Sequence, residues 1–473
     1  MKKDTPRQSV GMGLSVTKLT SLLYKIRDFM GTSLARWIVL GLFVVQAGIL
    51  VFTVQIGTPP DETNDIQFIQ YYANHSLSPT FTKQQPTYYL GDKTREVDYL
   101  YHYAMSLVVR VLPLSPVAED RAIRLISVAV GLLGFLTLAK VLKLLGLSAA
   151  VITASFLLLT NLPMVLLMSS AINNDVFVWL GMALGMLLLL RLWKKPSAID
   201  MTWLMALSLI GGLVKRTLLP LGMIFVVLGA IIFVRNTRTI LAGFKRFNWR
   251  LCLAAVVFLI GLGLFTERVG GNLIHYGSVT VTCEQVHGTA PCYDFWSNVR
   301  ARGLAQLPPQ PSVPIPFFVV RWLGESFFNI VDIQTQGWHH TVRPARALVP
   351  LLVFLLIGGL VYGFIYEKKR FAGDEISRHR VYIALIALFF VLVHMATNYS
   401  TYRHVKVFGI ALNGRYILPS VLPLAVLSGF YWSRLLARRP RLLVVLAIGV
   451  VLFTILGSGL LVMFRNPQLY TGQ

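Results

Sequence analysis

Apolar stretches of about 20 residues recur along the whole chain, and this repetition constrains the fold more than any other feature. A helix of that length crosses roughly 30 Å of hydrocarbon. The composition agrees, because 55% hydrophobic and 14% charged residues give the 473-residue chain a mean hydropathy of +0.65. We therefore expect an all-α polytopic membrane protein with about eleven transmembrane helices. The expected spans are 37–56, 123–145, 148–170, 175–193, 201–214, 217–234, 251–266, 347–366, 381–397, 416–433 and 442–464.

The formal net charge of +24 raises the question of a nucleic-acid partner. Its placement favours a membrane instead. If the N-terminus is cytoplasmic, the short inner segments hold 26 of the 44 Lys and Arg residues, as the positive-inside rule requires. Acids divide the other way, with six of 20 inside and fourteen outside. We therefore expect no nucleic-acid partner, and we look for chemistry on the external face.

The chain divides into one membrane domain with short ends. Apolar residues on one face of 15–30 predict an amphipathic helix on the inner surface, and the first apolar run predicts an uncleaved anchor. External segments 57–122 and 267–346 are long and aromatic, which favours juxtamembrane helices. The expected units are a cytoplasmic segment 1–36, a transmembrane domain 37–464 and an external tail 465–473.

Two cysteines bracket part of the second external segment. Cys283 and Cys292 could form a small disulfide in an oxidising compartment, and the sequence leaves that pairing open.

Four polar clusters fall at the expected external ends of the spans. Carboxylates there can take a proton from a substrate hydroxyl, and cations can hold a phosphate. A charge at mid-bilayer costs roughly 2.5–3.5 kcal/mol, so a Lys-Arg pair between two short spans favours a wetted cavity. The clusters are Asp61-Glu62 with Asp65, Asn173-Asn174-Asp175, Lys215-Arg216, and Asn413-Gly414-Arg415-Tyr416.

Each cluster also has a purely structural interpretation. The first acids follow a proline, as in the first turn of a surface helix. The Asn-Asp pair could cap a helix, the Lys-Arg pair could reach the lipid headgroups, and Arg415 could be an interfacial anchor. Convergence of acids and cations at one membrane level favours a substrate that carries both a hydroxyl and a phosphate.

These residues resemble the GT-C superfamily of membrane glycosyltransferases, and most of all the protein mannosyltransferases and aminoarabinose transferases. The chain departs from that group in one place. A His often precedes the group's first-loop proline and tyrosine stretch, whereas Gln84 and Gln85 stand here. The motifs that carry the resemblance are Pro60-Asp61-Glu62-Thr63, Gln85-Pro86-Thr87-Tyr88-Tyr89, Arg124-Leu125-Ile126-Ser127, Asn173-Asn174-Asp175 and Gly414-Arg415-Tyr416-Ile417-Leu418-Pro419.

The resemblance implies transfer of a sugar from a polyprenyl-phosphate carrier to an acceptor hydroxyl on the external face, with inversion at the anomeric carbon. A phosphate is a good leaving group, so the enzyme chiefly needs a base and cations. By analogy Asp61 is the base, and Glu62 orients the acceptor or serves instead. The implied substrate-binding residues are Asn174, Asp175, Lys215, Arg216, Arg415, Tyr416 and Arg124. Members differ in metal use, so a divalent cation stays open.

Two other classes remain as alternatives. A transporter or flippase of lipid-linked sugars would need a similar cavity, although such proteins tend to show paired halves and polar mid-helix positions. A polysaccharide polymerase or ligase would share the donor type. We expect a multi-pass enzyme of a bacterial cytoplasmic membrane, with an external active site. Its expected partners are a polyprenyl-phosphate-linked sugar donor, a glycan, lipid or protein acceptor, and membrane lipid.

The topology can be tested with a reporter fused after Gly57. We expect the reporter on the external side, because the inner segments carry the higher density of Lys and Arg. Protease accessibility of the reporter in sealed vesicles checks this, and a cytoplasmic signal would contradict the site assignment.

Overall fold

Helices are the only regular secondary structure in the part of the chain that the structure describes. This computed structural model describes residues 21, 24–59, 61–75, 95–112, 114–245, 248–306, 313–331, 344–366, 375–405, 414–438, 442–456 and 459–464. Residues 1–20, 85–89 and the expected tail 465–473, together with Asn413, lie outside the described residues.

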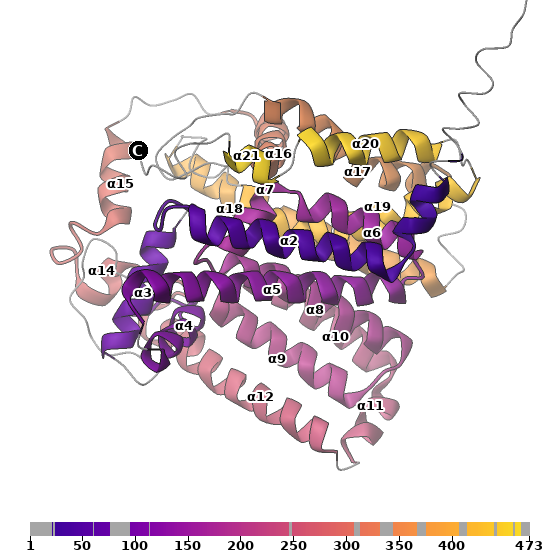
Figure 1. Cartoon of the computed structure of the whole chain (residues 1–473). Helices are drawn as coiled ribbons and strands as arrows, with labels where there is room; N and C mark the ends of the chain where they lie inside the picture. The colour runs from indigo at the N-terminus through magenta and orange to yellow at the C-terminus, as the bar shows by residue number, and fades with distance from the viewer. Residues whose placement is uncertain are drawn as a thin grey trace, which may run out of the picture.

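Most of the longer helices run roughly side by side across the molecule, and the short helices α3, α4, α14 and α15 lie at one end (Figure 1). The longer helices are α2 (Ser33–Thr53), α5 (Pro116–Leu144), α8 (Asp175–Lys194), α9 (Ala198–Val214), α10 (Leu218–Arg235), α12 (Trp249–Phe265), α16 (Ile315–Val331), α17 (Pro344–Tyr366), α18 (Glu375–Val405), α19 (Leu418–Arg438) and α20 (Leu442–Leu456). The shorter elements are α3 (Glu62–His75), α4 (Leu100–Val111), α6 (Ala149–Thr160), α7 (Pro163–Ser170), α11 (Thr237–Phe244), the π-helix η1 (Thr266–Gly270), α13 (Gly271–Tyr276), α14 (Cys283–His287), α15 (Trp296–Ala305), the 3₁₀ helix η4 (Gly414–Tyr416) and α21 (Gly459–Phe464).

All eleven apolar stretches are helical over most of their length, but a count of about eleven membrane spans is not confirmed. Within the described residues, six helices are long and apolar enough to cross a membrane, or seven if a bent pair counts as one span. That pair is α6 and α7, which meet at 71°. Pro163 starts α7, and a proline donates no backbone hydrogen bond to a preceding turn, so the expected span 148–170 is broken there. Other stretches, such as α9, form helices shorter than a full span.

The helices pack around a buried apolar core, and their outer surface also carries large apolar side chains. Phe135 of α5 lies 5.1 Å from Phe43 of α2, 5.6 Å from Phe156 of α6 and 5.4 Å from Trp179 of α8, measured between ring centroids. In contrast, Leu259 of α12 is 61% exposed. Large apolar side chains on such an outer face are typical of a surface that contacts lipid.

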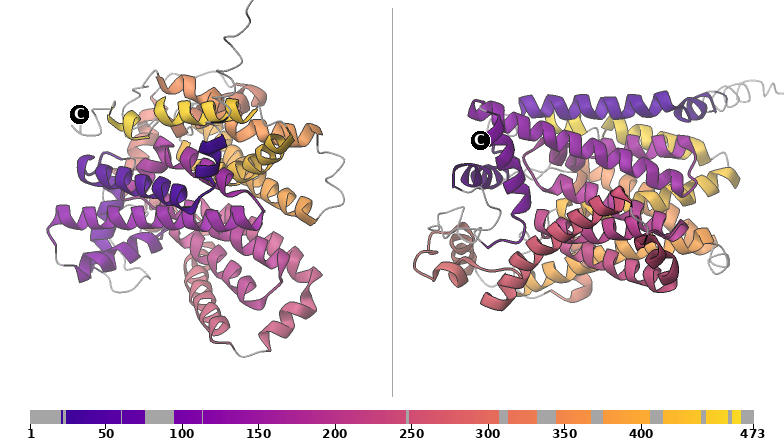
Figure 2. Two further views of the ribbon diagram at one scale, coloured as in Figure 1. Left: turned by 45° about the vertical axis from the view of Figure 1, so that its right-hand side comes forward. Right: turned by 90° about the horizontal axis from the view of Figure 1, so that it is seen from below.

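The expected external segments contain the short helices at one end of the bundle. Helices α3 and α4 lie in the first segment and pack against each other, and α14 and α15 lie in the second (Figure 2). Helix α16, also in the second segment, packs against α7 and α17 and buries Trp322 completely. That segment therefore contributes to the main core as well as to the end of the bundle.

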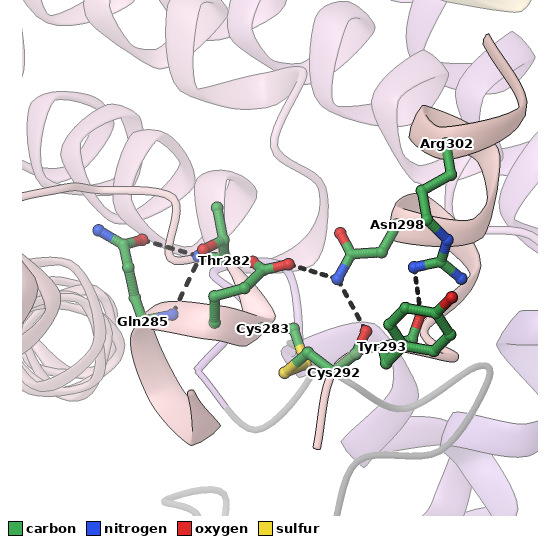
Figure 3. Close-up of a disulfide and its surroundings, with 8 residues drawn as sticks. Thr282, Cys283, Gln285, Cys292, Tyr293, Asn298 and Arg302 are labelled. Atoms are coloured by element: carbon green, nitrogen blue, oxygen red, sulfur yellow. Dashed lines mark hydrogen bonds between the residues drawn. A yellow bond between two sulfur atoms is a disulfide. The ribbon is translucent and has the colours of Figure 1, made fainter. Parts of the chain in front are cut away.

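A disulfide joins Cys283 to Cys292, which answers the question that the sequence left open (Figure 3). Both cysteines are buried against Phe295. The Asn298 amide donates to the carbonyl of Cys292 at 2.8 Å, and Thr282 and Gln285 form a capping box at the start of α14. The disulfide thus holds α14 and α15 as one small lobe.

Replacing both cysteines, Cys283→Ser with Cys292→Ser, should destabilise this lobe by about 2–3 kcal/mol, because the closed loop restricts the unfolded chain. Hydrogen exchange should become faster in peptides from 277–306 and stay unchanged in the bundle. The control is Cys252→Ser, since Cys252 is an unpaired and exposed cysteine. Equal exchange in the double variant and the control would contradict the expectation.

Candidate active site

Asp61 stands out by its backbone. Its φ of 64° is positive, and within the described residues no other non-glycine residue shares this. Aspartate tolerates the left-handed region better than most residues, but at a cost of roughly 1–2 kcal/mol. The Asp61 carbonyl accepts from the amide of Asp65 at 2.9 Å, so this residue opens α3. Such strain is frequently found at functional sites, and it marks Asp61 as a candidate.

The neighbouring carboxylate, Glu62, is completely buried in an ion pair with Arg124. Two guanidinium nitrogens of Arg124 donate to Glu62, Nε to Oε1 at 2.8 Å and Nη2 to Oε2 at 2.6 Å. The amides of Ile172 and Gly57 also donate to this carboxylate, each at 2.8 Å. Arg124 further donates to the carbonyls of Val51, Val54 and Gln55. We call this set of contacts the Glu62–Arg124 anchor.

The anchor joins four segments that are distant in sequence. They are the C-terminal end of α2, the first turn of α3, helix α5 and the turn before α8. Because Glu62 follows Asp61 directly, the anchor fixes where Asp61 can lie. It also explains the strained turn, since Gly57, with φ of 87°, must bring its amide to Glu62 within five residues.

Acids and cations alternate in a network beside Asp61. Arg415 Nη2 lies 2.5 Å from Asp61 Oδ2, and Arg415 Nη1 lies 3.8 Å from Asp175 Oδ2. Lys215 Nζ is 3.1 Å from Asp175 Oδ1 and donates to Asn174 Oδ1 at 2.5 Å. Of the four charged side chains, Asp61 is 38% exposed and the other three are nearly buried. The network is therefore open to solvent mainly at Asp61.

Each member comes from the end of a different element. Asp175 lies in the first turn of α8, where its amide donates to the Asn173 side chain at 2.6 Å. Its negative charge there suits the helix dipole. Lys215 caps the C-terminus of α9, and Arg415 sits in η4 just before α19. The ends of four helical elements thus meet at one place.

Gly414 allows η4 to lie against α16. A Cβ at position 414 would come within 2.5 Å of the carbonyl carbon of Asn329 and 2.6 Å of the amide of Ile330. These are backbone atoms that cannot move aside cheaply, so only glycine fits. The close approach sets the position of Arg415, which follows it.

Burial and charge act in opposite directions on the two cations. Burial alone would lower the pKa of Lys215, but Asp175 raises it above its ordinary value. Burial would likewise lower the pKa of Arg415, and the neighbouring Tyr416, Asp61 and Asp175 raise it. Both side chains therefore stay positively charged near neutral pH, as a site for an anion requires.

The remaining candidates lie in different surroundings. The Tyr416 hydroxyl accepts from Arg415 Nη2 at 3.2 Å, so it borders the network. Arg216 turns away from Lys215, and its guanidinium lies 3.5 Å from Glu96 and 3.8 Å from Asp98. The sequence interpretation grouped it with Lys215, but adjacent residues in a turn can face different neighbours. Arg124 is fully occupied by the anchor described above.

Sequence reasoning did not predict a pairing of Asp65 with His102. His102 Nε2 of α4 lies 2.8 Å from Asp65 Oδ1 of α3, and both side chains are buried. Burial raises the pKa of Asp65, and the hydrogen bond to His102 opposes that shift. This contact fixes α4 against α3 one turn beyond Asp61. A single His with no spacing motif carries no signal that could have revealed it.

No group of three or more His, Cys, Asp or Glu side chains within the described residues could hold a metal ion. The carboxylates near Asp61 are instead engaged with Arg415, Lys215 and Arg124. Among the described residues these carboxylates therefore offer no cluster for a divalent cation, and we derive no step through one.

Comparison with known proteins adds little to this geometry. The sequence matches no family model and none of the curated proteins. One solved structure with a detectable likeness is the oligosaccharyltransferase of Archaeoglobus fulgidus in its apo form, with a TM-score of 0.41 and 11% sequence identity over 90% of this chain. The chain spans about half of that protein's length, 55%.

Arg124→Met should destabilise the protein by about 3–5 kcal/mol, because it leaves the Glu62 carboxylate buried without its cation. Thermal unfolding in detergent checks this. The matched control is Arg27→Met, which removes an exposed ion pair with Asp28 and should change stability by less than about 1 kcal/mol. Equal melting temperatures for the two variants would show that the buried Glu62 carboxylate does not depend on Arg124.

Proposed function

We propose that this protein is a GT-C-type membrane glycosyltransferase that moves a sugar from a polyprenyl-phosphate carrier to an acceptor hydroxyl at the external face of the membrane. The observation that carries the proposal is the short contact between Asp61, a strained and partly exposed carboxylate, and the buried Arg415. A base and an anion-binding cation lie side by side, as the reaction requires.

In the proposed reaction, Asp61 is the general base. It takes the proton of the acceptor hydroxyl as that oxygen attacks the anomeric carbon, and attack from the side opposite the phosphate inverts this centre. With 38% of its side chain exposed, Asp61 is accessible to an acceptor. Glu62 has no exposed surface and accepts four hydrogen bonds, so we assign it a positioning role rather than that of an alternative base.

Arg415 and Lys215 are the proposed phosphate ligands. A guanidinium can bind two phosphate oxygens at once, and an ammonium adds a point charge. Asp175 and Asn174 hold Lys215, and the Tyr416 hydroxyl borders Arg415. Arg216 lies beside Glu96 and Asp98, outside this network. We therefore place it at the edge of the proposed site and assign it no contact with the phosphate. Arg124 acts through the Glu62–Arg124 anchor.

The membrane setting follows from the same proposal. A polyprenyl chain would stay in the bilayer while its phosphate reaches the network at the ends of the helices. We place this end outside a bacterial cytoplasmic membrane, as the distribution of Lys and Arg suggests. The acceptor is then a glycan, lipid or protein on the external face.

Asp61→Asn should lower the transfer rate about 100-fold or more, because asparagine cannot accept the proton. Asparagine also tolerates a positive φ, so the turn should persist. Purified protein in lipid, given labelled polyprenyl-phosphate sugars, measures the rate, and thermal unfolding confirms the fold.

The control is Asp294→Asn, which removes an exposed carboxylate in the disulfide lobe and should transfer sugar at the wild-type rate. Sugar transfer by Asp61→Asn at the rate of the wild type would show that another group is the base. Movement of intact lipid-linked sugar across vesicles, without cleavage, would favour a transporter instead.

A further inference from the structure

We propose that Arg415 exchanges partners during the reaction, so that it holds Asp61 before the donor binds and the donor phosphate afterwards. Asp61 then becomes available as a base only when the donor is present. This inference rests on the proposed function and adds an order of events to it.

The starting contact restrains the base. Arg415 Nη2 donates to Asp61 Oδ2 at 2.5 Å, which is a short, charge-assisted hydrogen bond. While this contact lasts, Arg415 occupies Oδ2 of Asp61 and holds the carboxylate in place, so that oxygen is not open to the hydroxyl of an acceptor.

The two partners differ in how tightly they are held. Only 6% of the Arg415 side chain is exposed, and η4, which carries it, lies against α16 at Gly414. Asp61 is 38% exposed at the outer edge of the network. An incoming phosphate therefore meets the guanidinium from the side that Asp61 occupies, and Asp61 is the partner that can turn away.

The rest of the network supports this exchange. Asp175 also faces Arg415, but at 3.8 Å, and Lys215 neutralises it from the other side at 3.1 Å. Asp175 is thus also paired with Lys215, and it lies farther from Arg415 than Asp61 does. When Asp61 turns away, a phosphate oxygen can take the place of its carboxylate beside Arg415 Nη2.

The charges balance through the reaction. The acceptor proton moves to Asp61, the acceptor oxygen bonds to the anomeric carbon, and the bond from that carbon to the phosphate oxygen breaks. Its electron pair stays on the phosphate, which changes from a diester anion to a monoester with one more negative charge. Asp61 loses one negative charge at the same time, so the total charge does not change. Arg415 faces Asp61 before the donor binds and the phosphate afterwards.

Binding of a short-chain polyprenyl phosphate, which needs no knowledge of the sugar, tests the exchange. Asp61→Asn removes the competing anion and should bind this probe about fivefold more tightly than wild type. Arg415→Met should bind it more weakly, and adding Asp61→Asn to Arg415→Met should give no gain. Asp294→Asn, which removes an equal charge elsewhere on the outer face, should leave the affinity unchanged.

The outcomes separate the two proposals. Unchanged or weaker binding by folded Asp61→Asn would overturn the exchange, while sugar transfer by wild type would still support the proposed function. A gain that persists in the Arg415→Met background would also overturn it, because the effect would not pass through Arg415. If wild type transfers no sugar, the proposed function fails whatever the binding data show.

Asp61→Gly, which also suits a positive φ, replaces Asp61→Asn if the latter does not fold.

Discussion

The geometry of this protein's candidate site depends on one buried ion pair, between Glu62 and Arg124. Desolvating two charges is expensive, so such a pair adds little net stability compared with apolar packing, but it tolerates few alternative arrangements. Here every strong acceptor position of the carboxylate is used, and the donors come from three separate parts of the chain. The pair therefore specifies how α2, α3, α5 and α8 meet, and with them the place of Asp61.

Two adjacent carboxylates consequently take different roles. Glu62 points into the protein and is satisfied by hydrogen bonds, whereas Asp61 points to the outer edge and meets Arg415. The positive φ of Asp61 accompanies this divergence. The strained residue of this turn, Asp61, is thus also the carboxylate that is partly exposed.

The sequence predicted the helical content of the fold well and its spans less well. Hydropathy shows where apolar helices lie, but a helix break at Pro163 and short helices such as α9 depend on local backbone geometry. Likewise, the sequence predicted that Asp61, Asp175, Lys215 and Arg415 lie at helix ends. It could not show that Arg216 faces Glu96 instead, because side-chain direction in a turn is set by the packing around it.

The sequence by itself determined that this chain is apolar, helical and rich in acids and cations near the ends of its helices, because those properties follow from composition and spacing alone. Only the tertiary structure decided which of these charges meet. Asp61 and Arg415 are separated by 354 positions, and their contact exists because the Glu62–Arg124 anchor and the fit of Gly414 against α16 bring both to one place. Contacts between such distant residues arise from packing, which no local pattern encodes.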